Sequence, residues 1–200
     1  MVYLVDDDPG VIKALSRLLR AKGHEVRSYS SPQAFLDEHD VAVPGCVVLD
    51  VSMPGLDGLE IQRVLTAASG YHRPIVFVTG KGDIPTSVRA MKAGAVDFLT
   101  KPVKDQDLLE AVSRAEARDA DSRRLHSEIE SMQAKVSKLT PREREVLTHV
   151  VAGRLNKQIA GDLGTVEKTI KVHRSRMMEK LGIRTVADLV RMSEKLNLSR

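Results

Sequence analysis

The segment CVVLDVSMPGLDG, residues 46–58, decides the fold class of this chain. Its first six residues are apolar except for Asp50, which is typical of a central strand that is buried on both faces of a parallel sheet. Segments with helical spacing separate it from similar apolar, β-branched runs at residues 2–5, 25–29, 75–80 and 96–100. Strands that alternate with helices predict an α/β domain.

Five such strands are expected to form a doubly wound parallel sheet of order 2-1-3-4-5, in which strands 1 and 3 meet at the switch point where ligands bind. Asp6 and Asp7 end the first strand, and Asp50 ends the third. The predicted order therefore brings three carboxylates together. Asp8, directly before Pro9, has a simpler explanation as a helix N-cap.

Three carboxylates at one edge of a sheet favour a hard divalent cation, and Mg²⁺ is the usual choice beside phosphate. Lys101 follows the fifth strand in FLTKP and would bring a compact positive charge to the same edge. A carboxylate beside Mg²⁺ and a lysine is equipped to act as a nucleophile and to form an aspartyl phosphate.

Composition narrows the class of protein. The chain has 200 residues, of which 42% are hydrophobic, and this suits one large or two modest domains. No run reaches the roughly 18 apolar residues that span a bilayer, and the N-terminus does not resemble a signal peptide, so we expect no membrane partner. Cys46 is the only cysteine, so we expect a reducing cytoplasm and no structural zinc site.

Charge and local amino-acid composition divide the chain into three parts. Residues 139–200 carry 13 Lys/Arg against 7 Asp/Glu, whereas the front of the chain is nearly neutral. Residues 104–138 are charged, lack glycine and favour helix. We expect a first domain over residues 1–118, a helical linker over residues 119–138 and an all-α DNA-binding domain over residues 139–200.

LVDDD, VVLDVSMPGLDG, VFVTGKGD and MKAGAVDFLTKP occur in this order within residues 2–118, and together they resemble the signature blocks of bacterial response-regulator receiver domains. The resemblance implies a CheY-like fold in which Asp50 accepts a phosphoryl group from a histidine kinase. It implies Mg²⁺ bound by Asp7, Asp50 and the backbone carbonyl of Ser52, with Asp6 acting indirectly, and Lys101 beside the phosphoryl group.

The same resemblance implies two switch residues. Thr79 would hydrogen-bond the phosphoryl group, Phe98 would then turn inward, and the bond Lys101–Pro102 would be cis. Taken alone, Thr79 is also an ordinary strand-end residue, and Phe98 is an ordinary core aromatic. Asp57 and Asp97 are interpreted as caps or surface residues outside the site.

The basic part of the chain contains start signals for four helices. Thr140 forms a capping box with Glu143, and the other expected caps or first residues are Asn156, Val166 and Thr185. Two short helices and a tight turn before a longer basic helix predict a helix-turn-helix.

The third of these helices, from about Val166 to Leu181, has an apolar stripe and an opposite polar side at 100° per residue. We expect the stripe to be buried, and it comprises Val166, Ile170, His173, Met177 and Leu181. Base edges are expected to be contacted by the opposite side, which comprises Lys168, Lys171, Val172 and Ser175. Phosphate contacts are expected from Lys157, Thr169 and Arg176.

LTPREREVL, NKQIAGDLG and TIKVHRSRMMEKLG, within residues 139–196, resemble the LuxR/FixJ/NarL type of DNA-binding domain. Thr165–Val166 departs from the family pattern of an apolar residue followed by a small or hydroxyl cap, and Ser175 stands where some relatives have lysine. With both domains, the chain is most similar to FixJ-type regulators. This implies promoter DNA with two half-sites as a partner and a homodimer that forms on phosphorylation.

Two surfaces are candidates for contacts between copies. Val88 and Lys92 share a helix face at spacing i, i+4. A heptad seam in the linker comprises Leu125, Ile129, Met132, Val136 and Leu139. The seam either pairs in a dimer or packs on the chain's own DNA-binding domain.

Two other functions remain open at this point. A phosphohydrolase with an aspartyl-phosphate intermediate commonly has a D-x-D motif after its first strand, whereas this chain has D-D-D-P. A pseudo-receiver that never binds phosphate would serve only as a dimerisation platform. The loss of an acid or of the lysine would favour it, and none is missing.

Overall fold

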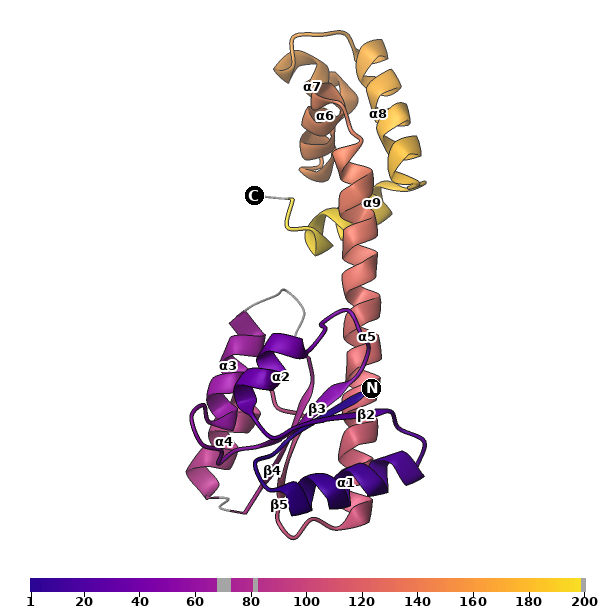
Figure 1. The fold of residues 1–200 in the computed structure, drawn as a ribbon. Helices are drawn as coiled ribbons and strands as arrows, with labels where there is room; N and C mark the ends of the chain where they lie inside the picture. The colour runs from indigo at the N-terminus through magenta and orange to yellow at the C-terminus, as the bar shows by residue number, and fades with distance from the viewer. Residues whose placement is uncertain (68–72, 81–82, 199–200) are drawn as a thin grey trace. The chain divides into compact units, whose positions relative to one another are not determined.

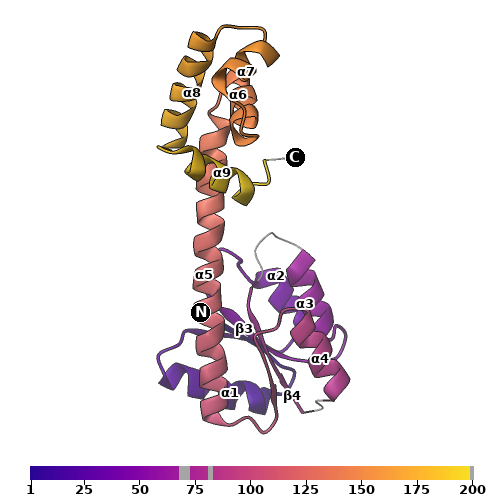
Figure 2. The same ribbon diagram turned by 180° about the vertical axis from the view of Figure 1, so that it is seen from behind.

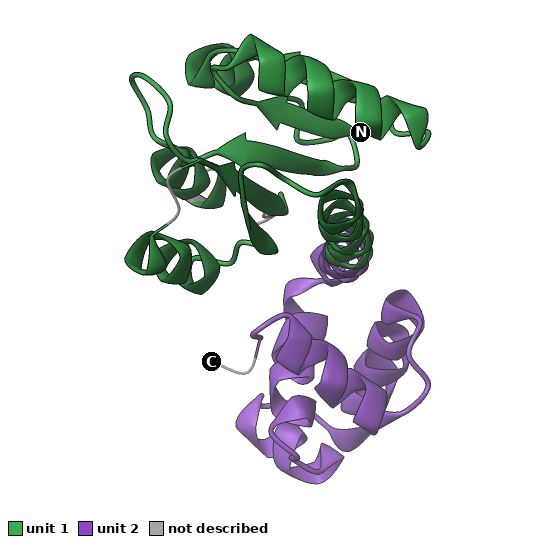
Figure 3. Cartoon of the chain, turned by 90° about the horizontal axis from the view of Figure 1, so that it is seen from below, with its two compact units in different colours: residues 1–124 green, residues 125–200 purple. Residues whose placement is uncertain are grey.

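The structure is a computed structural model that describes residues 1–67, 73–80 and 83–198. They form two compact units, residues 1–124 and residues 125–200 (Figure 3). Helix α5 (Asp105–Ser137) contributes residues to both units.

The first unit contains a parallel sheet of five strands in the order β2-β1-β3-β4-β5 (Figure 1). This confirms the order that the sequence predicts. The strands are β1 (Val2–Val5), β2 (Val26–Tyr29), β3 (Cys46–Asp50), β4 (Ile75–Thr79) and β5 (Asp97–Thr100). Strands β1, β3 and β4 are buried along their whole length, because helices cover both faces of the sheet.

Two helices cover one face of the sheet and three cover the other (Figure 1 and Figure 2). The first pair is α1 (Pro9–Ala21) and α5, and the other three are α2 (Pro32–Glu38), α3 (Gly58–Ala67) and α4 (Ile84–Lys92). Residues of β3 alternate between the two cores. Val47 and Leu49 pack on the side of α2, α3 and α4, and Val48 packs on the side of α1 and α5.

The register of the sheet brings the residues that end the strands to one edge. Val5 of β1 pairs with Leu49 of β3, so the residues that follow them, Asp6 and Asp50, are neighbours. Asp50 pairs in turn with Val78 of β4, and Thr79 comes next. The pairing of buried apolar strands therefore brings the residues expected at the switch point together.

Asp8 caps α1, as the sequence predicts. Its Oδ1 accepts hydrogen bonds from the backbone N–H groups of Gly10 (2.7 Å) and Val11 (3.3 Å), and Pro9 is the first helical residue. This local role explains one of the three consecutive aspartates.

The first unit extends to residue 124, and hydrogen bonds connect α5 to the segment before β3. Asp119 Oδ2 accepts hydrogen bonds from the Gly45 backbone N–H (3.0 Å) and from Arg123 Nε (2.8 Å). The Arg123 guanidinium also donates to the carbonyl oxygens of residues 41–43. These bonds lie beyond residue 118, where the sequence places the end of the first domain, so the start of the expected linker packs as part of the first unit.

The second unit contains the end of α5 and four further helices around one apolar core. These are α6 (Pro141–Val151), α7 (Asn156–Asp162), α8 (Glu167–Leu181) and α9 (Val186–Lys195). Thr140 and Thr185 cap α6 and α9, as predicted, and Thr140 completes a capping box with Glu143.

The starts of α7 and α8 differ from the prediction. Leu155 occupies the N-cap position of α7, and Asn156 is its first helical residue, whose Oδ1 accepts a hydrogen bond from Arg174 Nη1 (3.0 Å). Val166 is the N-cap of α8 and is 66% exposed, so its assignment to the buried stripe is wrong. The helical spacing places Val166 on the apolar side, but the residue precedes the helix and lies outside the core.

The heptad seam packs largely within the second unit. Val136 and Leu139 belong to its core, and Met132 packs against that core. Leu125, by contrast, is 50% exposed. The C-terminal part of the seam therefore packs on the chain's own DNA-binding domain, which is the second of the two alternatives given above.

Candidate functional site

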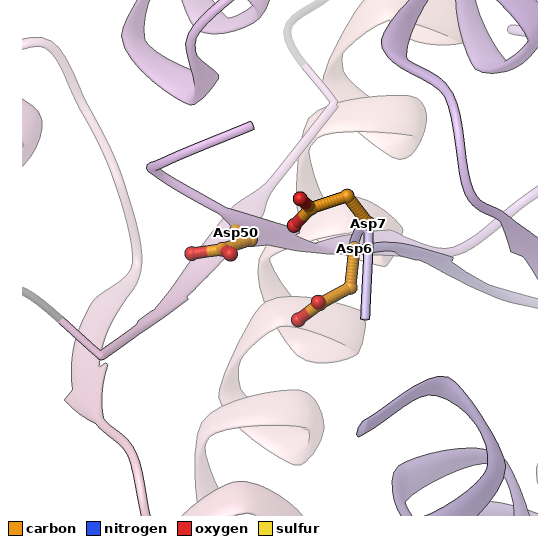
Figure 4. A group of neighbouring side chains, drawn as sticks. All are labelled: Asp6, Asp7 and Asp50. Carbon is orange, nitrogen blue, oxygen red and sulfur yellow. The ribbon is translucent and has the colours of Figure 1, made fainter. Parts of the chain in front are cut away.

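Three carboxylates meet beyond the ends of β1 and β3. Figure 4 shows the side chains of Asp6, Asp7 and Asp50 next to one another. One carboxylate oxygen from each lies within 4.8 Å of the other two. Asp6 and Asp50 are buried, with 1% and 5% of their surface exposed, whereas Asp7 lies at the surface. The group is therefore closed on one side and open to solvent at Asp7.

Lys101 neutralises part of this negative charge. Its Nζ donates hydrogen bonds to Asp6 Oδ2 (2.6 Å) and to Asp50 Oδ2 (3.2 Å). It is held after β5 by a bond from its backbone N–H to the carbonyl oxygen of Thr79 (2.8 Å), and the peptide bond Lys101–Pro102 is cis. Three carboxylates and one ammonium leave an excess of negative charge at the site.

The pKa values of Asp6 and Lys101 are both raised, but for different reasons. Burial raises the pKa of Asp6, although the hydrogen bond from Lys101 acts in the opposite direction. Burial alone would lower the pKa of Lys101, but the hydrogen bond to Asp6 and the charge of Asp50 outweigh it and raise that pKa. Lys101 is therefore held in its charged form beside Asp50.

The loop after β3 folds back over Asp50. The backbone N–H of Ser52 donates to Asp50 Oδ1 (3.3 Å), and that of Gly58 donates to the carbonyl oxygen of Val51 (2.9 Å). A Cβ atom at Gly58 would lie 2.4 Å from the carbonyl oxygen of Asp50, so only glycine allows this close approach. The turn keeps Ser52 at the surface beside the carboxylate group.

The donor set fits a hard divalent cation. All three side chains offer carboxylate oxygens, and Lys101 compensates for only one of their charges. Asp7 and Asp50 could coordinate Mg²⁺ from the open side, while Asp6 remains bonded to Lys101. Such an ion would bring the positive charge that a phosphoryl group requires.

The two expected switch residues lie on neighbouring strands. Thr79 is fully buried at the end of β4. Phe98 of β5 is half-buried, and its ring centroid lies 6.1 Å from that of Phe77 at an interplanar angle of 45°. Asp57 and Asp97, which the sequence analysis places outside the site, form other interactions. Asp57 Oδ1 accepts a hydrogen bond from the backbone N–H of Glu60 (2.7 Å), and Asp97 forms an ion pair with Arg114.

Helix α8 separates its buried and exposed residues as expected, apart from its start. Ile170, Met177 and Leu181 are in the core of the second unit, and His173 is half-buried. Thr169 is half-buried, and the exposed DNA-contact candidates are Lys157, Lys168, Lys171, Val172, Ser175 and Arg176. The helical spacing did not predict that Val166 is exposed. The departure of Thr165–Val166 from the family's capping pattern was the one sign in the sequence that the start of this helix is unusual.

Comparison with known proteins identifies both units. Residues 2–113 match the family model of the response regulator receiver domain, and residues 137–193 match that of bacterial regulatory proteins of the luxR family. The chain is a response regulator.

Relatives match this response regulator along almost its whole length. Nodulation protein W of Bradyrhizobium diazoefficiens is 44% identical over 100% of this chain and 87% of its own length. The transcriptional regulatory protein FixJ of Azorhizobium caulinodans is 40% identical over 96% of this chain and 90% of its own. The solved structure of the response regulator StyR has a TM-score of 0.82 at 45% identity and covers 97% of this chain and 98% of that one.

Membership of this family decides the class of function. Response regulators with a LuxR-type domain are transcription factors and not enzymes, which removes the phosphohydrolase alternative. The family implies phosphorylation by a histidine kinase, DNA binding through the second unit and Mg²⁺ at the acidic site of the receiver. Among the residues that the structure describes, no helix is both long and apolar enough to cross a membrane.

Proposed function

We propose that Asp50 is the phosphoacceptor of this response regulator and that its phosphorylation controls the binding of promoter DNA in the cytoplasm. The observation that carries the proposal is the meeting of Asp6, Asp7 and Asp50 within 4.8 Å, with Lys101 bonded to Asp50. Asp7, Asp50 and the backbone carbonyl of Ser52 bind Mg²⁺ directly, and Asp6 acts indirectly. Bound Mg²⁺ supplies charge compensation for the incoming phosphoryl group.

The chemistry is a transfer between two nucleophiles. A carboxylate oxygen of Asp50 forms a bond to phosphorus while the bond from phosphorus to an imidazole nitrogen of the kinase breaks, and the electron pair leaves with the imidazole. Lys101, which already donates to Asp50 Oδ2, offers its charge to the oxygens of the transferred group. Asp6 holds that ammonium in place through its 2.6 Å hydrogen bond.

Phosphorylation then shifts the receiver toward an active conformation. Thr79 hydrogen-bonds the phosphoryl group, and Phe98 turns toward the space that Thr79 leaves. A receiver that already populates this conformation slightly needs only a ligand that favours it. The half-buried position of Phe98, in contact with the core through Phe77, is compatible with such a rotation.

The active receiver forms a homodimer through α4. Val88 and Lys92 lie on one face of this helix, and Val88 is exposed although it is apolar. A dimer presents two copies of α8 to two half-sites. In each copy Lys168, Lys171, Val172 and Ser175 contact base edges, while Lys157, Thr169 and Arg176 contact phosphates.

Labelling with a small phosphodonor tests this assignment. Acetyl phosphate and Mg²⁺ should add one acid-stable phosphoryl group to the full chain, measured by intact mass. Asp50→Asn should prevent labelling, and Asp57→Asn is the matched control because Asp57 caps a turn outside the site. Labelling of the Asp50 variant at the wild-type level would refute the proposal.

A further inference from the structure

The four helices that follow α5 in the described part of the chain begin in two different ways. Helices α6 and α9 have threonine caps, whose hydroxyl groups accept hydrogen bonds from the N–H groups of Glu143 (3.3 Å) and Asp188 (3.1 Å). Helices α7 and α8, which form the helix-turn-helix, have Leu155 and Val166 at their N-cap positions. In the described part of the chain, neither N-cap residue accepts a side-chain hydrogen bond from its helix, although Gln158 Oε1 accepts one from the Leu155 backbone N–H (2.8 Å) at the start of α7.

An apolar residue at these positions is doubly unfavourable. A serine, threonine, asparagine or aspartate cap would stabilise the helix, and leucine and valine are among the poorest residues at an N-cap. Both side chains are also in water: Leu155 is 68% exposed and Val166 is 66% exposed. Among the described residues of the second unit, the other exposed large hydrophobic side chains are 50% exposed or less.

The backbone holds Val166 rigidly in front of α8. Its carbonyl oxygen accepts from the N–H groups of Thr169 (3.0 Å) and Ile170 (3.3 Å). The preceding turn is fixed by the bond from the Thr165 N–H to the carbonyl oxygen of Ala160 (2.9 Å). The valine methyl groups are therefore presented to solvent on a rigid turn, at the end of the helix that leads into the major groove.

The surroundings of Val166 favour DNA as the partner that covers it. Lys168 and Lys171 follow on the same helix and are exposed, and Lys171 forms an ion pair with Glu167 (3.1 Å). The last 62 residues of the chain carry 13 Lys/Arg against 7 Asp/Glu. A cationic surface attracts a polyanion. In the major groove of DNA, the apolar group is the C5 methyl of thymine.

We propose that Val166 is a specificity-determining residue that contacts a thymine methyl group, and that this contact accounts for a valine at a position where a polar residue would stabilise α8 better. The inference rests on the DNA-reading face of α8 proposed above.

The test uses a duplex that the acetyl-phosphate-treated wild-type chain selects from a random pool. Each thymine is replaced in turn by deoxyuracil, which lacks only the methyl group. We expect one replacement to weaken wild-type binding about four-fold, the effect of one buried methyl group, and to have no effect on Val166→Ser. The serine should also cap α8 and raise the midpoint of thermal unfolding by about 4 to 8 °C.

Two further variants complete the test. Val166→Thr restores a cap with almost the same shape and keeps the question answerable if the serine variant folds poorly. Val186→Ser is the matched control, because Val186 is also exposed but lies on α9, which Thr185 already caps. It should keep the wild-type response to every deoxyuracil.

A Val166→Ser variant that is more stable but retains every wild-type response to deoxyuracil would overturn the inference. So would an equal loss of affinity for all duplexes, since that would indicate contact with the DNA backbone. If instead no deoxyuracil affects the wild type and Lys171→Ala binds normally, the proposed reading face of α8 is itself wrong.

Discussion

Asp7→Asn should make the receiver more stable without metal and less responsive to Mg²⁺. In the described part of the chain, Lys101 donates side-chain hydrogen bonds to Asp6 and Asp50 and none to Asp7. The substitution therefore removes one negative charge and preserves both bonds of Lys101. Because Asp7 is exposed, an amide of the same shape meets no packing penalty.

The magnitude follows from the geometry of the site. Asp6, Asp50 and Lys101 together carry one net negative charge, and the oxygens of Asp7 lie within 4.8 Å of those of the two acids. One pair of like charges at this distance costs about 0.9 kcal/mol in water and about 3.5 kcal/mol at an effective dielectric constant of 20. Asp7 faces solvent, so we expect a gain of about 1 kcal/mol in the free energy of unfolding.

Tyrosine fluorescence reports selectively on the receiver, because the chain has no tryptophan and its three tyrosines all precede residue 124. Urea unfolding should be followed with EDTA and then with Mg²⁺. At 100 times the dissociation constant, Mg²⁺ should stabilise the wild type by about 2.7 kcal/mol, and Asp7→Asn by clearly less. A variant that is less stable than the wild type in EDTA, or that gains as much from Mg²⁺, would refute this account of the site.

Three other predictions concern DNA, the dimer and the second unit. Lys171→Ala should cost about 1–3 kcal/mol at the selected site and relax one base preference, whereas Arg176→Ala should weaken all sequences alike and reduce the salt slope by about one; identical binding profiles would contradict the assignment. Val88→Asp should leave labelling intact and abolish phosphorylation-dependent dimers in gel filtration, and dimers that persist would move the interface elsewhere. Glu143→Gln should destabilise the second unit by about 1–3 kcal/mol, because the Lys180 Nζ donor at 2.6 Å loses its charged acceptor. That hydrogen bond lowers the pKa of Glu143 below its ordinary value of 4.5. The bond therefore contributes fully to the free energy of unfolding above pH 4.5, and this contribution is lost as the pH falls through the native pKa. Acidification should consequently lower the thermal unfolding midpoint less in the variant than in the wild type.

The sequence alone determines the features that depend on near neighbours or on simple alternation. The caps at Asp8, Thr140 and Thr185 are decided by atoms within three residues, and the structure confirms all three. The five apolar runs predict a parallel sheet, because a strand buried on both faces must be apolar throughout. The order 2-1-3-4-5 is that of the doubly wound fold assigned to it, and the structure confirms it. From that order it follows that the acids after β1 and β3 are neighbours.

Only the tertiary structure decides what depends on distant segments. It shows which carboxylates Lys101 contacts, and it joins α5 to the loop before β3 through Asp119. It also places Val166 in solvent, although helical spacing puts it on the apolar side of α8. Periodicity gives the direction in which a side chain leaves a helix, but burial requires another segment to cover it. No covering segment reaches Val166 within the described residues, and its exposure therefore had to be observed.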